Sequence, residues 1–167
     1  TFKGVFNNSS AFDLYLPFSH GAWKPILRGT YSEGTETDYF LSVEILSNGL
    51  IELIFLANEN DNRNIIYPIW FMGLVCNTLY YLQRVRNATD THNLEYALEV
   101  QINNVCGVLE VDGYGGQFPG RSFGAIKESN IVFPRYSVGP ADSFQQLSNV
   151  VESDFWNHSG VVSTDDN

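Results

Sequence analysis

The chain of 167 residues has the length of a single domain, and with 44% hydrophobic and 14% aromatic residues it is too apolar to be disordered. Nineteen acidic residues against nine basic ones give it a net charge of −10, which disfavours long-range attraction to nucleic acid or to anionic lipid. The composition therefore predicts a soluble protein that binds neither nucleic acid nor a membrane.

The two ends of the chain look irregular. Residues 1–22 precede the first expected strand, which covers 26–31 and is followed by a polar loop at 32–38. Residues 157–167 form an acidic tail. The one methionine is Met72, so the sequence starts after any initiator methionine. We expect a single domain over residues 1–167, which is either a whole protein or a piece of a longer one.

The cysteines favour a reducing compartment. Cys76 and Cys106 both lie inside apolar runs, where a free thiol behaves as a small buried side chain, and a single bridge between them is the alternative. Residues 1–12 lack the basic start and the apolar run of a signal peptide. We therefore expect a cytoplasmic protein.

The clearest element is a hairpin over residues 40–56. A two-residue turn would place Glu52 on the apolar face, whereas a three-residue loop at 47–49 gives one wholly apolar face. We therefore predict the three-residue loop, with Gly49 in the left-handed conformation. In this register Glu44 lies directly opposite Glu52.

A long helix is predicted after this hairpin, because Pro68 suits a first helical turn and Arg84 and Arg86 suit a last one. Residues 65–82 approach the length of a membrane span, but small and polar residues interrupt them, so we expect a helix buried on most sides. A narrow stripe of this helix is predicted to meet another backbone, a solvent edge or a second subunit: Gly73, Asn77, Tyr80 and Arg84.

A second hairpin is predicted over residues 93–113, with a two-residue turn at Asn103 and Asn104. This register places Glu95 across from Asp112. One face would be apolar, and the other would carry four acids: Glu95, Glu99, Glu110 and Asp112. If both hairpins share a sheet, these acids and the Glu44–Glu52 pair form one acidic surface.

Such a surface has three interpretations. It is a solvated sheet face, a surface that binds a partner, or a site for Mg²⁺, Mn²⁺ or Ca²⁺, which prefer oxygen ligands. Alternate polar residues are needed on any solvated sheet face, so we favour the first interpretation and predict no metal and no cofactor. His20, His92 and His158 lie far apart in the sequence and have no ligands at zinc spacing.

A loop rich in glycine and aromatic residues is expected at 113–124, followed by a short strand at 130–136. A closing amphipathic helix is then predicted from a capping-box signal at Ser143 and Gln146. Its apolar side chains recur at helical spacing: Phe144, Leu147, Val151 and Phe155. The expected fold is α+β, an antiparallel sheet built from hairpins and covered on one face by the long buried helix and the C-terminal helix.

The loop contains Gly-Arg-Ser-Phe-Gly at 120–124, which resembles the nucleophile elbow of α/β-hydrolases over those five residues. That resemblance implies a serine nucleophile, Ser122, with Asp142 or Asp154 and then His158 as its partners. The flanking sequence supplies neither the strand before the motif nor the helix after it.

Our leading hypothesis is a non-enzymatic interaction or sensor module, either alone or as an accessory domain of a larger intracellular protein. It would bind a protein partner, or a second copy of itself, through the acidic face or the 113–124 loop. The candidate binding residues are Tyr114, Phe118 and Arg121 in the loop, and Glu44, Glu52, Glu95, Glu110 and Asp112 on the face. The alternative is a hydrolase that acts through Ser122 or through a divalent metal on the acidic face.

Overall fold

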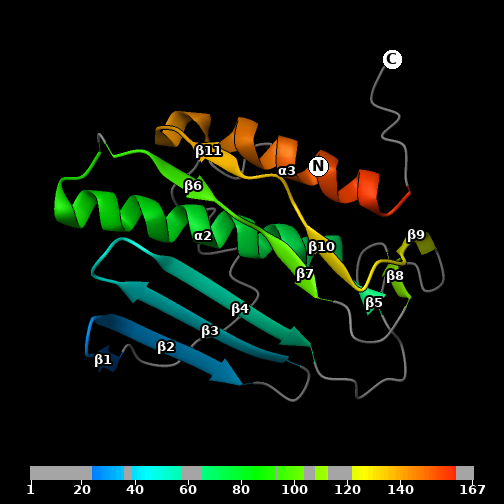
Figure 1. Cartoon of the computed structure of the whole chain (residues 1–167), viewed down its shortest axis with the longest axis horizontal. Coiled ribbons are helices and arrows are strands. Elements are labelled where there is room, and N and C mark those ends of the chain that lie inside the picture. Colours follow the sequence, from blue (N-terminus) through cyan, green and yellow to red (C-terminus); the bar gives the residue numbers. More distant parts are fainter. Residues whose placement is uncertain are drawn as a thin grey trace.

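A computed structural model describes residues 24–35, 39–57, 65–92, 94–103, 108–112 and 122–160. The fold is α+β, as the sequence predicts, and in the view of Figure 1 its two helices lie above a four-stranded sheet. The helices are α2 Pro68–Thr89 and α3 Phe144–His158, preceded by a short 3-10 turn, η2 Ala141–Ser143. The strands are β1 Lys24–Ile26, β2 Gly29–Thr35, β3 Tyr39–Leu46, β4 Ile51–Ala57, β5 Ile65–Ile66, β6 Tyr96–Leu98, β7 Gln101–Asn103, β8 Leu109–Asp112, β9 Ser122–Ile126, β10 Asn130–Val132 and β11 Tyr136–Val138.

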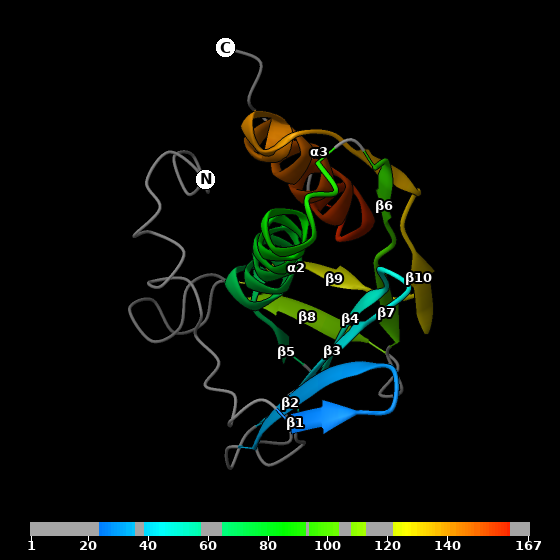
Figure 2. The same ribbon diagram turned by 90° about the vertical axis from the view of Figure 1, so that its left-hand side faces the viewer.

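Strands β1 to β4 form an antiparallel sheet in chain order, and it lies along one side of α2 (Figure 2). The predicted register of the β3–β4 hairpin is confirmed, because Glu44 pairs with Glu52 and Leu46 N donates to Leu50 O at 2.8 Å. Gly49 has a φ of 89°, the left-handed conformation that the three-residue loop requires. The inward face of this sheet is apolar and packs against Trp70, Leu74 and Tyr81 of α2.

The prediction of one strand at 26–31 is wrong, because a turn at Leu27 and Arg28 divides it into β1 and β2. Leu27 is 97% exposed at this turn. The predicted polar loop is wrong over residues 32–35, which continue β2 and pair with β3, while 36–38 lie outside the described residues. Ser32 is fully buried there, so hydrogen bonding between strands has overridden the polar composition.

The predicted second hairpin is also wrong. Strand β7 pairs with β10 and β6 pairs with β11, so residues 96–103 form a two-stranded ribbon with 130–138. Strand β8 instead pairs in parallel with β5 and antiparallel with β9. The expected alternation of apolar side chains in 96–102 is present, but alternation fixes the inward face and not the identity of the neighbouring strand. The strand predicted at 130–136 is two strands, separated at Phe133, whose N–H donates to Val100 O at 3.0 Å.

Helix α2 is the long buried helix that the sequence predicts, with Pro68 in its first turn and Arg86 in its last. Of the predicted stripe, Gly73 and Asn77 are buried, and Arg84 is exposed. In the described part of the chain we find no helix with the length and hydropathy needed to cross a membrane.

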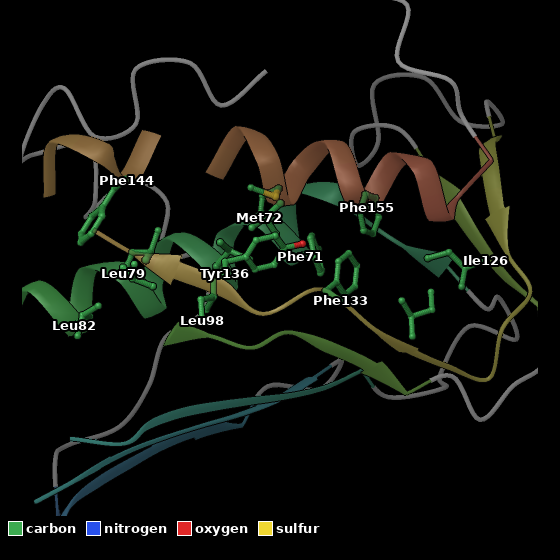
Figure 3. Packing of buried hydrophobic residues seen from close by; sticks show 14 of the residues in the cluster. Phe71, Met72, Leu79, Leu82, Leu98, Ile126, Phe133, Tyr136, Phe144 and Phe155 are labelled. Atoms are coloured by element: carbon green, nitrogen blue, oxygen red, sulfur yellow. The ribbon is translucent and has the colours of Figure 1, made fainter. Parts of the chain in front are cut away.

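The main core lies between α2, α3 and the β6–β11 ribbon (Figure 3). Phe71 of α2 stacks on Phe155 of α3 with ring centroids 4.5 Å apart, and the ring centroid of Phe133 lies 5.3 Å from that of Phe71. The predicted amphipathic helix is thereby confirmed as α3. The predicted capping box is wrong, because Ser143 makes no side-chain cap and its hydroxyl donates to Pro140 O at 2.7 Å.

Candidate functional site

A groove lies between β4 on one side and the β6–β7 segment on the other, with α2 behind them. Its volume is about 1880 Å³, larger than the roughly 300–1,000 Å³ of pockets that enclose a small organic ligand. A space of this size suits a polymer segment better than a metabolite.

The floor of the groove is apolar. It is formed by one face of α2, on which Trp70, Leu74 and Thr78 follow one another at helical spacing. Trp70 meets Phe55 of β4 edge to face, with ring centroids 5.6 Å apart. The Thr78 hydroxyl donates to Leu74 O within the same helix at 2.9 Å, so its polarity is satisfied locally.

The first wall is the edge of a sheet. Among the described strands, β4 is hydrogen-bonded only to β3. Antiparallel pairs alternate between residues that exchange main-chain hydrogen bonds and residues that do not, and the bond from Leu46 N to Leu50 O fixes this alternation. Leu46 and Leu50 form a hydrogen-bonded pair, so Ile51 and Leu53 belong to the pairs that exchange no hydrogen bonds. Their N–H and C=O groups therefore point away from β3, toward the groove.

The second wall is the inner edge of the β6–β11 ribbon. Val100 O accepts a hydrogen bond from Phe133 N across the ribbon, so the same alternation directs the main-chain groups of Gln101 toward the groove. Strands β4 and β6–β7 run in the same direction in Figure 1. A segment that is antiparallel to one wall is therefore antiparallel to the other as well.

One end of the groove is marked by the tip of the β3–β4 hairpin. A Cβ atom built on Gly49 would lie 3.9 Å from Cε1 of Tyr96, so this tip lies against the start of β6. Within the described part of the chain, four charged residues line the groove: Glu52, Glu95, Glu99 and Arg135. Arg135 Nε lies 3.3 Å from Glu99 Oε1, and neither Glu52 nor Glu95 has an ion-pair partner among the described residues.

The two glutamates of the Glu44–Glu52 pair have different positions relative to the groove. Both side chains lie on the face of the sheet that turns away from α2, but only Glu52 lines the groove. Lys24 Nζ, on the same sheet, lies 3.2 Å from Glu33 Oε1 and forms an ion pair with that carboxylate. The hydroxyl of Tyr31 donates to the same Glu33, which lowers the pKa of the Glu33 carboxyl and raises the pKa of Tyr31.

The second acidic group predicted from the sequence is not assembled. Glu95 precedes β6, whereas Glu110 and Asp112 belong to β8, in a different sheet, so the predicted pairing of Glu95 with Asp112 is wrong. In the described ranges, no three histidine, cysteine or acidic side chains are grouped so that they could hold a metal ion. The loop residues Tyr114, Phe118 and Arg121 lie outside the described residues.

The secondary structure around Ser122 differs from that of a nucleophile elbow. Ser122 begins strand β9 opposite Asp112, and that strand leads into β10 rather than into a helix. Asp142 and His158 lie at opposite ends of α3, whose 15 residues span roughly 22 Å. Asp154 accepts a hydrogen bond from Tyr136 Oη at 2.6 Å, and burial together with this bond raises the pKa of Tyr136. Asp142 and His158 are therefore far apart, and the hydrolase alternative through Ser122 stays a prediction.

Cys76 carries a free thiol buried against α3. Burial raises the pKa of the Cys76 thiol to about 12, so the thiol is protonated and unreactive at neutral pH. Its expected state as a buried free cysteine is confirmed, and Cys106 lies outside the described residues.

The groove was not predicted from the sequence, although the apolar residues on both faces of β4 indicate it. Ile54 and Leu56 are 41% and 56% exposed on the outward face of β4, while the inward face is also apolar. A strand that is apolar on both faces at the edge of a sheet is typical of a surface that awaits a partner.

The chain was compared with protein-family models, with curated proteins and with solved structures, and none of the three comparisons finds a match.

Proposed function

We propose that this chain is a non-enzymatic interaction module that binds an extended polypeptide segment of a partner in the groove between β4 and β6–β7. It acts on its own or as an accessory domain of a larger intracellular protein. One observation carries the proposal: the edge of β4 directs the main-chain groups of Ile51 and Leu53 into an apolar groove, without a second strand beside it among the described strands. An added strand would bond to such an edge through its own main chain.

A polypeptide fits the groove better than a small molecule or a lipid. A small-molecule pocket encloses its ligand and holds it by a few convergent buried polar groups, whereas this groove is long and its charged residues lie at the rim. A lipid would use the apolar floor but would leave the main-chain groups of Ile51 and Leu53 unpaired. A strand satisfies both features, because alternate side chains reach the floor while its backbone bonds to the wall.

The test is a display selection of eight-residue peptides that alternate apolar with polar residues, followed by affinity measurement of the enriched peptides by fluorescence anisotropy. Thr78→Trp fills the floor, and it removes no hydrogen bond outside its own helix. Asn87→Trp is the matched control, since Asn87 is exposed on the same helix and does not line the groove.

We expect Thr78→Trp to weaken peptide binding at least tenfold and Asn87→Trp to leave it unchanged, with similar melting temperatures for both variants. If no peptide is enriched, or if the enriched peptides bind Thr78→Trp as well as the unaltered protein, the proposal is wrong. Saturable binding of a fluorescent fatty acid that Thr78→Trp abolishes, with no peptide enriched, would assign the groove to lipid instead.

A further inference from the structure

Among the described residues, the two charges of the groove rim that have no ion-pair partner lie toward one end, whereas Glu99 pairs with Arg135 farther along the second wall. Glu52 is the second residue of β4 and Glu95 directly precedes β6, so both lie near the hairpin tip, where Gly49 approaches Tyr96. Farther along β4 the outward side chains are Ile54 and Leu56, which are apolar and exposed. The rim is thus acidic at the tip and apolar beyond it on the β4 side.

Outward-facing side chains of a docked strand would lie beside these residues. Directly opposed residues on neighbouring strands have Cβ atoms about 4.5–5.5 Å apart, so each outward side chain meets the outward side chain of the wall. The outward residues of both walls at the tip are acidic: Glu52 from β4, and Glu95 two residues before the outward Ala97 of β6. A basic side chain placed there would be attracted from both sides.

The direction of the docked strand follows from the walls. Antiparallel pairing is slightly more stable per residue than parallel pairing, and a strand that is antiparallel to β4 is also antiparallel to β6–β7 because both walls run the same way (Figure 1). Strand β4 begins at the hairpin tip, so an antiparallel strand would end there. Its C-terminal residues would then lie between Glu52 and Glu95.

From these observations, and resting on the proposed function, we infer that the partner segment is an apolar β-strand whose C-terminal end carries basic residues. The inward side chains of the strand pack on Trp70 and Leu74, and its last outward side chains, lysine or arginine, bind Glu52 and Glu95. A second copy of this chain is a poor occupant, because each copy carries a net charge of −10. The partner is therefore a different protein, or a segment of one, with a basic strand end.

The test uses peptides of matched composition, blocked at both ends so that no terminal charge contributes. In the basic-last peptide, five alternating valine and threonine residues are followed by Lys-Val-Lys, and in the basic-first peptide Lys-Val-Lys comes before them. Two further peptides end in Glu-Val-Glu or in Thr-Val-Thr. Affinities and association rates are measured at low and at high salt.

We expect the basic-last peptide to bind roughly 2- to 25-fold tighter than the basic-first peptide, because each exposed ion pair is worth roughly a 1.4- to 5-fold change in affinity. The gain should come mainly from faster association and should shrink at high salt. The double variant Glu52→Gln/Glu95→Gln should remove the preference. Glu128→Gln/Asp142→Asn, which removes the same charge outside the groove, should keep it.

Equal binding of the basic-last and basic-first peptides would overturn the inferred polarity, and so would a preference that persists in Glu52→Gln/Glu95→Gln. In both cases the proposed function stands, provided that Thr78→Trp still blocks the peptides. If none of the peptides binds, both the polarity and the strand-binding function fail. Concentration-dependent dimerisation of the protein in sedimentation, abolished by Thr78→Trp, would identify a second copy as the occupant and overturn the inference of a basic partner.

Discussion

Arg86 is a buried cation whose partners are main-chain carbonyl groups. Its side chain is near the C-terminal end of α2, and the residue is only 2% exposed. The guanidinium donates to Gly139 O at 2.8 Å and to Val138 O at 3.1 Å, and it reaches Leu94 O at 3.4 Å. It also lies 4.9 Å from the ring centroid of Tyr96. Arg86 therefore joins the end of α2 to the end of β11 and to the start of β6.

The size of its contribution can be worked from these contacts. Hydrogen bonds from a charged donor are worth about 1.5–3 kcal/mol each, and two of the three have good geometry. Against them stands the cost of burying a cation that no described carboxylate neutralises, and Nε has no hydrogen-bond partner among the described residues. Because removal would leave the carbonyls of Val138 and Gly139 unsatisfied, we expect Arg86→Met to lower the free energy of unfolding by about 3 kcal/mol.

Urea unfolding followed by circular dichroism measures this change, with the slope m checked for constancy. In thermal unfolding, a loss of about 3 kcal/mol corresponds to a fall of roughly 6–12 °C for a domain of this size. Arg84→Met is the matched control: it makes the same exchange on the same helix, but Arg84 is exposed and its guanidinium donates to Tyr80 Oη at 3.1 Å. Its effect should stay within about 0.5 kcal/mol. An Arg86→Met protein as stable as Arg84→Met would show that the cost of burying the guanidinium cancels its hydrogen bonds, which would refute this reasoning.

Three further changes test the packing, the acidic pair and the buried thiol. Phe155→Ala should lower the free energy of unfolding by about 3–5 kcal/mol, because Phe155 is fully buried and stacks on Phe71; urea unfolding measures it. Glu44→Gln should raise that free energy by roughly 0.2–1 kcal/mol at low salt, since it removes a like charge directly opposite Glu52. The Cys76 thiol should resist iodoacetamide in the folded protein, as mapped by mass spectrometry. The pKa of the Cys76 thiol is about 12 in the folded protein, above its ordinary value of 9.0. The contribution of the thiol to the free energy of unfolding is therefore complete below about pH 9 and is lost as the pH rises toward 12.

Each of these has its own contradicting outcome. A Phe155→Ala protein within 1 kcal/mol of the unaltered one would mean that the core around Phe71 is not packed as described. A Glu44→Gln protein that is less stable would mean that a cation bridges the two glutamates. For the thiol, Cys76→Ala should make urea stability less dependent on pH between 9 and 11, and an unchanged dependence would contradict the raised pKa.

The elements that the sequence predicts correctly are those fixed by short-range physics. The β3–β4 register depends on a loop of three residues and on alternation within one hairpin, so Gly49 and the apolar face were sufficient to place Glu44 opposite Glu52. The two helices depend on periodicity over several turns, which is the most reliable pattern in a sequence.

The errors are at pairings between distant segments. In the hairpin predicted over 93–113, alternation identified which side chains face the core, but β6 and β7 pair with strands about thirty to forty residues later in the chain. The parallel pairing of β5 with β8 joins segments that lie before and after α2 in the sequence. In addition, strand β5 has only two residues, Ile65 and Ile66, which are too few to predict a strand. The groove depends on these pairings, since its second wall exists only because β10 and β11 hold β6 and β7 away from β8.

Glu52 has two physical roles at the edge of the sheet. An unpaired strand edge is a template for pairing with another copy, and outward charges on the edge oppose that association. With Glu52 on β4 of every copy and a strongly negative charge overall, edge-to-edge pairing would bring like charges together, whereas a basic strand end would be attracted to the same position. One side chain can thus reject the wrong partner and favour the right one, which is how specificity arises from a difference between two affinities. An open apolar groove without the acidic rim would favour self-association. An acidic rim without the groove would provide no binding surface, so the two features are useful only together.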